Sequence, residues 1–174
     1  MIDDVIYKPR SGEEVKAAAP PGTKVIPYSS LARIPAKPVD ILLYFLGRHN
    51  IILYQNPSLM NSGHWVSLSI YPEVKQAHFF SSYGGKPDEE KIRWVPRADL
   101  IRSGQGRNIL NDGLKELHRR GWEIHYNDYP FQKEGDDTAS CGIWTVAFLN
   151  SHQNPDSFAK YHHRSPHFYY TKYF

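Results

Sequence analysis

The sequence predicts an α+β domain in which a small mixed central sheet packs against helices. Three observations indicate this class. Short apolar and alternating segments between residues 51 and 81 are typical of strands, and a stripe of leucines followed by another alternating segment predicts a helix and a further strand. The segment 141–149 is apolar on nearly every side, which predicts a helix buried in the core. The chain of 174 residues, 40% hydrophobic and 22% charged, fits one domain, 1–174, with an ordinary core.

The N-terminal and C-terminal segments differ in composition from the middle of the chain. Residues 1–40 contain six prolines, which exclude long helices and central strands and predict an arm wrapped over the domain. Short helices are expected at 12–19 and at 39–46, where Asp40 is placed to satisfy the first free amides. The tail, 151–174, is rich in aromatic residues and histidines, and we expect it to pack against the core or to dock a partner.

The strands are predicted from apolar runs and from alternation. Residues 51–54 form an apolar run closed by Asn-Pro, which predicts a buried strand. Residues 64–70 alternate, which predicts a half-buried strand with Ser67 and Ser69 on its polar face. Residues 76–81 then return as an antiparallel partner after a connection longer than two residues.

Two further elements precede the buried helix. A stripe formed by Leu110, Leu114 and Leu117 predicts a helix within residues 107–120. Residues 122–126 alternate and predict another strand. We therefore expect the order strand, strand, strand, helix, strand and buried helix.

Composition and charge exclude several classes of site. Cys141 is the single cysteine, so the chain has neither an internal disulfide nor a cysteine-rich zinc site. Residues 91–120 carry eight basic and three acidic side chains, which we interpret as a solvated face. The tail histidines lack matched acidic or thiolate ligands, so we expect them to be solvated and predict no metal; they are His162, His163 and His167. No apolar segment reaches the roughly 18 residues of a membrane span and no secretory signal begins the chain, so we expect a soluble, intracellular protein.

Cys141 is the candidate nucleophile. It stands where a polar loop meets the buried helix, and the free amides and dipole of a helix N-terminus favour a thiolate. Asp136 and Asp137 act in the opposite direction, because nearby negative charge raises the pKa of a thiol, and the sequence leaves this balance open. A nucleophilic thiol needs a base, and His64 opens an alternating strand where its side chain is able to face a cleft.

Four motifs stand in a fixed order along residues 51–150: Gly63-His64-Trp65-Val66-Ser67-Leu68, Phe79-Phe80-Ser81-Ser82-Tyr83-Gly84, Gln132, and Ser140-Cys141-Gly142-Ile143-Trp144. In this order they resemble the adenovirus maturation protease and the proteases of SUMO and ubiquitin-like proteins. The resemblance implies a papain-like or adenain-like cysteine protease fold, with the nucleophile at the N-terminus of a buried helix.

The resemblance also implies a role for each matched residue. Cys141 would attack the scissile carbonyl, and His64 would take and return its proton. Gln132 and the backbone amide of Cys141 would stabilise the oxyanion. Trp65 would lie beside a narrow groove that favours small substrate residues such as glycine. Ser81 stands where the family usually has Asp, Glu or Asn, so it would orient the imidazole without supplying negative charge.

Two departures from the family pattern leave alternatives open. Asp88, in the loop after the strand, is an alternative source of the missing acid. The nine-residue step from Gln132 to Cys141 is longer than in the relatives, and Asn127 is an alternative oxyanion donor.

The function implied by the resemblance is a cysteine endopeptidase that cleaves after small, glycine-type residues. We expect a viral maturation protease that processes capsid or core precursors in the host cytoplasm, the nucleus or the virion. No cofactor and no membrane partner are expected, and a peptide or nucleic acid is a candidate activator. Three alternatives are an isopeptidase of SUMO-like or ubiquitin-like modifiers, an acetyltransferase on the same scaffold, and a peptide-binding module that has lost catalysis, with Ser81 as the mark of that loss.

Overall fold

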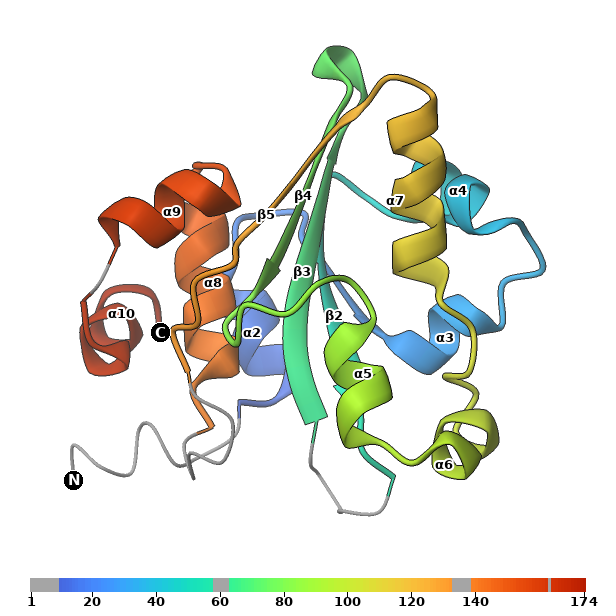
Figure 1. Cartoon of the computed structure of the whole chain (residues 1–174). Helices are drawn as coiled ribbons and strands as arrows, with labels where there is room; N and C mark the ends of the chain where they lie inside the picture. Colours follow the sequence, from blue (N-terminus) through green and yellow to red (C-terminus); the bar gives the residue numbers. More distant parts are fainter. Residues whose placement is uncertain (1–9, 58–62, 133–138, 163) are drawn as a thin grey trace.

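The computed structural model describes residues 10–57, 63–132, 139–162 and 164–174 of the chain. It is an α+β structure in which helices cover both faces of a five-stranded mixed sheet (Figure 1). This confirms the predicted α+β class with a mixed central sheet. No helix in these described ranges is both long and apolar enough to cross a membrane.

The five strands lie in the sheet in the same order as in the sequence. They are β1 (Lys24–Pro27), β2 (His49–Gln55), β3 (Gly63–Tyr71), β4 (Gln76–Ser81) and β5 (Glu123–Tyr126). The two inner pairings, β2–β3 and β3–β4, are antiparallel, and the two outer pairings, β1–β2 and β4–β5, are parallel. The predicted hairpin is therefore present; its connection includes a short 3₁₀ turn, Pro72–Val74, and ends at Lys75 in the left-handed conformation.

β3 is buried on both faces, which corrects the prediction of a half-buried strand. Ser67 and Ser69 lie on the face that was expected to be polar and exposed, yet their exposed fractions are 0% and 1%. The reason is α8 (Cys141–Ser151), which lies against this face; Thr145 of this helix donates a hydrogen bond to the Trp65 carbonyl oxygen at 3.3 Å. Small side chains on a strand allow a helix backbone to approach closely, so alternation here marks packing rather than exposure.

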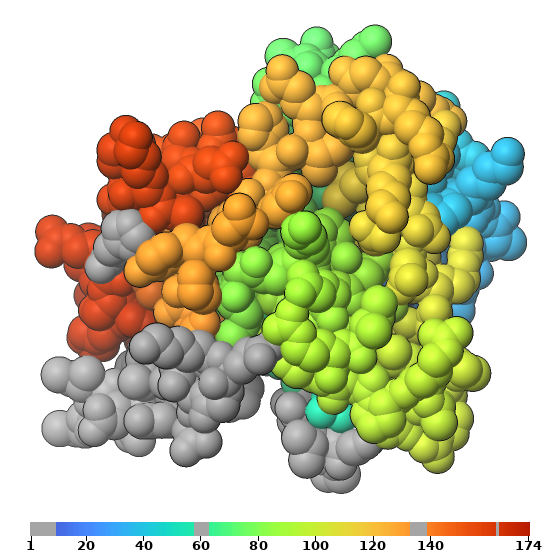
Figure 2. Space-filling model, in the orientation of Figure 1, coloured from blue at the N-terminus to red at the C-terminus, as the bar shows by residue number. Residues whose placement is uncertain are grey.

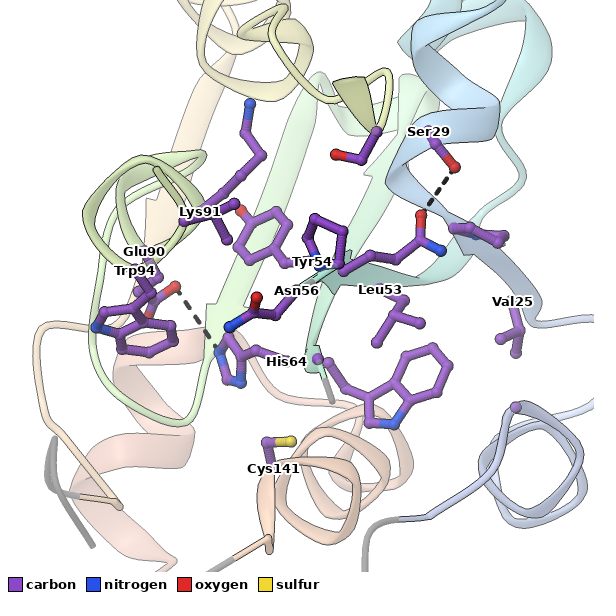
Figure 3. A pocket seen from close by; sticks show the side chains of 18 of the residues that line it. Val25, Ser29, Leu53, Tyr54, Asn56, His64, Glu90, Lys91, Trp94 and Cys141 are labelled. Carbon is purple, nitrogen blue, oxygen red and sulfur yellow. Dashed lines mark hydrogen bonds and ion pairs between the residues drawn. The ribbon is translucent and has the colours of Figure 1, made fainter. Parts of the chain in front are cut away.

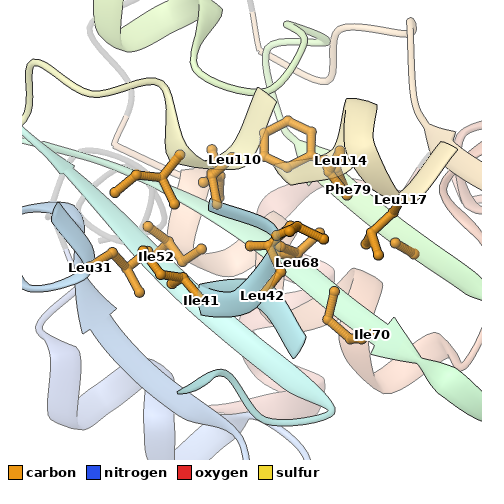
Figure 4. Close-up of a cluster of buried hydrophobic side chains, with 14 of the residues drawn as sticks. Leu31, Ile41, Leu42, Ile52, Leu68, Ile70, Phe79, Leu110, Leu114 and Leu117 are labelled. Atoms are coloured by element: carbon orange, nitrogen blue, oxygen red, sulfur yellow. The ribbon is translucent and has the colours of Figure 1, made fainter. Parts of the chain in front are cut away.

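The opposite face of the sheet is covered by α3 (Tyr28–Ala32), α4 (Pro38–Asp40), the π-helical turn η1 (Ile41–Phe45) and α7 (Ile109–Arg119). The predicted leucine stripe of α7 is buried here, as Figure 4 shows. It packs with aliphatic and aromatic side chains of the sheet and of η1, including Ile41, Leu42, Ile52, Leu68, Ile70 and Phe79. Removal of this apolar surface from water stabilises the fold.

The N-terminal segment is more than an arm wrapped over the domain. β1 extends the sheet at its edge, where its last residue, Pro27, is tolerated. Tyr28 is fully buried, and its hydroxyl donates to the Arg107 carbonyl oxygen at 2.6 Å and accepts from the Ile109 amide at 2.8 Å. The segment is thus part of the core on this face.

The helix predicted at 39–46 is present, but Asp40 does not cap it. The first turn begins at Pro38. Proline is favoured there because it has no N–H group, and an N–H at this position would lack an acceptor within the helix. Asp40 is the third residue of this turn. The predicted helix at 12–19 is α2 (Gly12–Ala18), in which Ser11 and Glu14 form a reciprocal capping box.

The C-terminal tail forms α9 (Pro155–Tyr161) and α10 (Pro166–Tyr173), which pack beside α8 on the face that also carries α2 (Figure 1). Phe158 is fully buried, and Phe80 of the sheet stacks on Phe148 of α8 with ring centroids 4.7 Å apart. The packing of the tail against the core is thereby confirmed. His162 stacks on Phe158 at 4.8 Å instead of being fully solvated, and His163 lies outside the described residues.

Residues 88–102 form two helices that the sequence did not predict, α5 (Glu89–Trp94) and α6 (Arg97–Arg102). Figure 2 shows them in yellow-green on the surface below α7. The basic segment is therefore not uniformly solvated. The exposed fraction of Lys91 is 1%, and its ammonium group donates to the carbonyl oxygens of Gln105 and Arg107 at 2.7 and 2.9 Å.

Gly113 in α7 allows η1 to approach closely, and Gly113→Ala is expected to destabilise the protein. A Cβ atom there would lie 2.6 Å from Leu42 Cδ1 and 3.1 Å from the Pro38 carbonyl oxygen. Such overpacking typically costs about 1–3 kcal/mol, against about 1 kcal/mol gained from the higher helix propensity of alanine. Urea unfolding should show a loss of stability, whereas Lys115→Ala on the exposed face of α7 should change it by less than about 0.5 kcal/mol. An unchanged or higher stability of Gly113→Ala would contradict the steric argument.

Candidate active site

A cleft opens at the end of the sheet where β3 begins and β4 ends. It is lined by His64 and Trp65 of β3, Glu90 and Trp94 of α5, and Cys141 of α8 (Figure 3). It continues past β2 and β1, and α2 borders it on one side while α5 and α6 border it on the other. Three of the residues predicted from the sequence, His64, Trp65 and Cys141, therefore meet in one cleft.

Cys141 is the first residue of α8, and the packing of this helix fixes its place. The Thr145 hydroxyl contacts the carbonyl oxygens of both Cys141, at 2.7 Å, and Trp65, at 3.3 Å, which ties the first turn of α8 to β3. The neighbouring Gly142 lies so close to the N-terminal segment that a Cβ atom would be 3.1 Å from Val15 Cγ1 and 3.2 Å from Arg10 Cβ. The thiol is buried, with 8% of the residue exposed.

The His64 ring lies between Glu90 and Cys141, as Figure 3 shows. Its Nε2 atom is 3.0 Å from Ser81 Oγ and 3.8 Å from Glu90 Oε2. Its Nδ1 atom is buried and has no hydrogen-bond partner among the described residues. The rings of Tyr83 and Trp94 contact the imidazole edge-on, with centroids 4.8 and 5.5 Å away, and hold its orientation.

Ser81 connects His64 to a carboxyl group that the sequence analysis missed. The Ser81 hydroxyl donates a short hydrogen bond to Glu90 Oε1, which also accepts from the Gly85 amide at 3.3 Å. Glu90 is fully buried. The sequence suggested Asp88 as the alternative acid, two residues before Glu90. The signal that separates the two is their orientation in the first turn of α5, which the sequence does not reveal.

The two alternative site residues raised by the sequence, Asp88 and Asn127, have hydrogen-bond partners outside the proposed catalytic groups or at the end of β4. The Asp88 carboxylate accepts from the Asn111 amide at 2.9 Å and lies near Lys91 in the core, away from the imidazole. The Asn127 side chain accepts from the Ser81 amide and donates to the carbonyl oxygens of Ser81, at 2.7 Å, and Tyr129, at 3.1 Å. Because both amide hydrogens of Asn127 have acceptors, this residue is not available as an oxyanion donor. It instead fixes the end of β4.

Gln132 is buried and is held by Ser82. The Ser82 hydroxyl donates to Gln132 Oε1, and the Ser82 carbonyl oxygen accepts from the amides of Phe131 and Gln132 at 2.7 and 2.9 Å. The hydrogen bond from Ser82 to the side-chain oxygen fixes the orientation of the Gln132 amide group. Asp136 and Asp137, which bear on the thiol pKa in the sequence analysis, lie outside the described residues.

Trp65 forms part of the wall beside the thiol. Its indole N–H donates to the Arg10 carbonyl oxygen at 3.1 Å, which attaches the N-terminal segment to the cleft. The exposed fraction of Trp65 is only 8%, so the ring narrows the cleft without projecting from it.

Burial dominates the ionisation of the site. It raises the pKa of the Cys141 thiol to about 11, although nearby backbone amides lower it, and it lowers the pKa of His64 to about 3. The pKa of Glu90 is raised to about 7 by burial, partly offset by the hydrogen bonds from Ser81 and Gly85. The resting pair at neutral pH is therefore a neutral thiol and a neutral imidazole. The effect of the helix N-terminus on the pKa of the thiol is therefore smaller than the effect of burial.

Glu90→Gln is expected to become more stable relative to the wild type as pH rises. Because the folded-state pKa of Glu90 is raised from 4.5 to about 7, the unfolded chain loses its proton first and stability falls across this range. The difference in unfolding free energy between variant and wild type should grow by about 3 kcal/mol from pH 4.5 to 7.5. Urea titrations at several pH values measure it. A flat difference for Glu90→Gln would contradict the burial argument.

Comparison with known proteins gives one informative similarity. No protein-family model matches the chain. Over 102 residues, 58% of its length, the chain is 33% identical to the uncharacterized protein V9 of the Sputnik virophage. The matched region spans about 55% of that relative's length. The similarity suggests a viral origin for the chain, and the name of the relative states no activity.

Proposed function

We propose that the chain is a cysteine peptidase with a papain-like or adenain-like arrangement of its catalytic groups. The observation that carries the proposal is the placement of His64 between Cys141, at the N-terminus of α8, and the Ser81 hydroxyl 3.0 Å from Nε2. A thiol beside an imidazole that is oriented by a third group is the arrangement that nucleophilic catalysis requires.

In the proposed reaction the proton moves from Cys141 Sγ to His64 Nδ1 as the sulfur attacks the scissile carbonyl carbon. A C–S bond forms, and the carbonyl π electrons move to oxygen. When the tetrahedral intermediate collapses, the C–N bond breaks and the amine leaves with the proton from Nδ1. Water then attacks the thioester with His64 as the base, which releases the acid and restores the thiol.

Two groups are proposed to stabilise the oxyanion. One is the backbone amide of Cys141, because the first amides of a helix lack intrahelical acceptors. The other is the Gln132 side-chain amide, oriented by its hydrogen bond from Ser82. Donors of this kind act on the developing charge in the transition state.

The proposed substrate is an extended polypeptide with small residues at the cleavage site. The aromatic side chains of Trp65, Tyr83 and Trp94 surround the reacting groups and favour small residues beside the thiol. Farther from the thiol the cleft passes Leu53 and reaches Ser29, and this length leaves room for several residues of a substrate chain. The Ser29 hydroxyl donates a hydrogen bond to the Gln55 side chain at 2.8 Å. The similarity to a virophage protein favours viral structural precursors as substrates.

Cleavage of a peptide library rich in Gly and Ala tests the proposal. Mass spectrometry should detect products cut after small residues, and Cys141→Ala and His64→Ala should abolish them. Gln132→Ala should lower kcat/KM by about 100- to 1000-fold, because one oxyanion donor is typically worth about 2.7–4 kcal/mol. Gln76→Ala, at the opposite end of β4, is the matched control and should leave the rate unchanged.

The other outcomes of this experiment identify other functions. Rapid release from a fluorogenic ubiquitin or SUMO substrate, with slow cleavage of free peptides, would indicate an isopeptidase. Dependence on an acyl-CoA would indicate an acetyltransferase. Peptide binding without turnover, unaffected by Cys141→Ala, would indicate a binding module and contradict the proposed chemistry.

A further inference from the structure

The family resemblance leaves one chemical function without a residue, because a serine stands where negative charge is expected. When the Cys141 proton moves to His64, an imidazolium forms inside a buried site, where an uncompensated charge is costly. The Ser81 hydroxyl orients the ring but carries no charge. Some other group has to compensate the imidazolium if the site is to react efficiently.

Glu90 is placed to provide that charge through Ser81. Its side chain is fully buried, Oε1 accepts the Ser81 hydroxyl hydrogen, and Oε2 lies 3.8 Å from His64 Nε2. Since the single hydroxyl hydrogen is given to Glu90, Ser81 Oγ accepts from Nε2–H of His64 at 3.0 Å. This order of donors assigns the proton of the neutral ring to Nε2 and leaves Nδ1 as the base on the side of Cys141.

We propose that Ser81 and Glu90 together replace the triad acid, with the serine hydroxyl as a bridge between the imidazole and a carboxylate on α5. Both are positioning residues that act through His64, and their role in peptide hydrolysis rests on the proposed function. The thiol proton moves to Nδ1, Nε2–H remains bonded to Ser81, and Ser81 remains bonded to ionised Glu90. All protons are accounted for within these four residues.

Burial allows Glu90 to change ionisation near neutral pH. Glu89 and Arg93 lie on the same helix and form an ion pair with each other, while Tyr54 from β2, His64 from β3 and Cys141 from α8 face Glu90 from the sheet and from the buried helix. Burial raises the pKa of Glu90 to about 7. Below this pH the protonated carboxyl supplies no charge to the bridge, and above it the carboxylate does.

Alkylation of Cys141 tests the bridge without any substrate. The chain has one cysteine, so the rate of reaction with iodoacetamide from pH 5 to 10 reports on a single thiol. The wild type should show a rise in rate centred near pH 7, in addition to the direct ionisation of the thiol at higher pH. Glu90→Gln and Ser81→Ala should each lose this rise, with about 10- to 100-fold slower alkylation at pH 8.

Two further variants separate the bridge from a structural role. Glu89→Gln, on the adjacent residue, should keep the wild-type profile. Ser81→Asp placed in the Glu90→Gln protein should restore fast alkylation at pH 8, because the new carboxylate reaches His64 directly, and its profile should shift to lower pH. A wild-type profile without a rise near pH 7, or a rise that persists in folded Glu90→Gln, would overturn the proposal.

Peptide cleavage by the same variants distinguishes this proposal from the proposed function. If the library is cleaved, loss of the bridge should lower kcat more than it changes KM, and it should remove the same rise from the pH–rate profile. If no peptide is cleaved but the alkylation profile depends on Glu90 as described, the bridge stands and the peptidase proposal fails. If peptides are cleaved with an unchanged pH profile in Glu90→Gln, the peptidase proposal stands and the bridge fails.

Discussion

The packing of α8 against the central strand β3 is the interaction on which the site depends. α8 is apolar around its whole circumference, because the sheet covers one side and α2, α9 and α10 contact the others. Thr145 ties its first turn to the Trp65 carbonyl oxygen, one residue after His64. The proposed nucleophile and the proposed base come from elements far apart in the sequence, and this helix-to-strand contact brings them together.

The same packing buries Cys141 and His64, with exposed fractions of 8% and 5%. Burial disfavours an isolated charge, so it raises the pKa of the thiol and lowers the pKa of the imidazole. It also strengthens any interaction with a charge that does form during a reaction, because the local dielectric constant is low. The hydroxyl and carboxyl groups behind His64 therefore matter more here than they would at an exposed surface.

Sequence reasoning predicted the elements that have a strong periodic or compositional signal. The buried helix at Cys141, the leucine stripe of α7 and the β3–β4 hairpin all follow from the spacing of apolar residues. It failed where tertiary packing reverses a local signal. Ser67 looks like a solvent-facing strand residue and is buried by α8.

The candidate site likewise contains residues that the sequence predicted and one that it did not. Cys141, His64 and Trp65 were predicted because each stands at a recognisable point of a motif, and the structure brings them into one cleft. Glu90 was missed because a six-residue helix with a polar sequence carries no signal for the burial of one particular carboxyl group. Lys91, the next residue, is buried in a different direction, which no periodic pattern would indicate.

The hydroxyl of Ser81 has a consequence for how such sites are compared between proteins. Because it spans the gap between a ring nitrogen and a carboxyl group, the proposed source of negative charge lies nine positions farther along the chain and on a helix instead of a strand. An alignment column at the strand end contains only a serine, and a reader of that column would score the site as lacking its acid. Equivalence between such proteins has to be judged from the location of charge in space, since side chains of different length and type occupy the same electrostatic position.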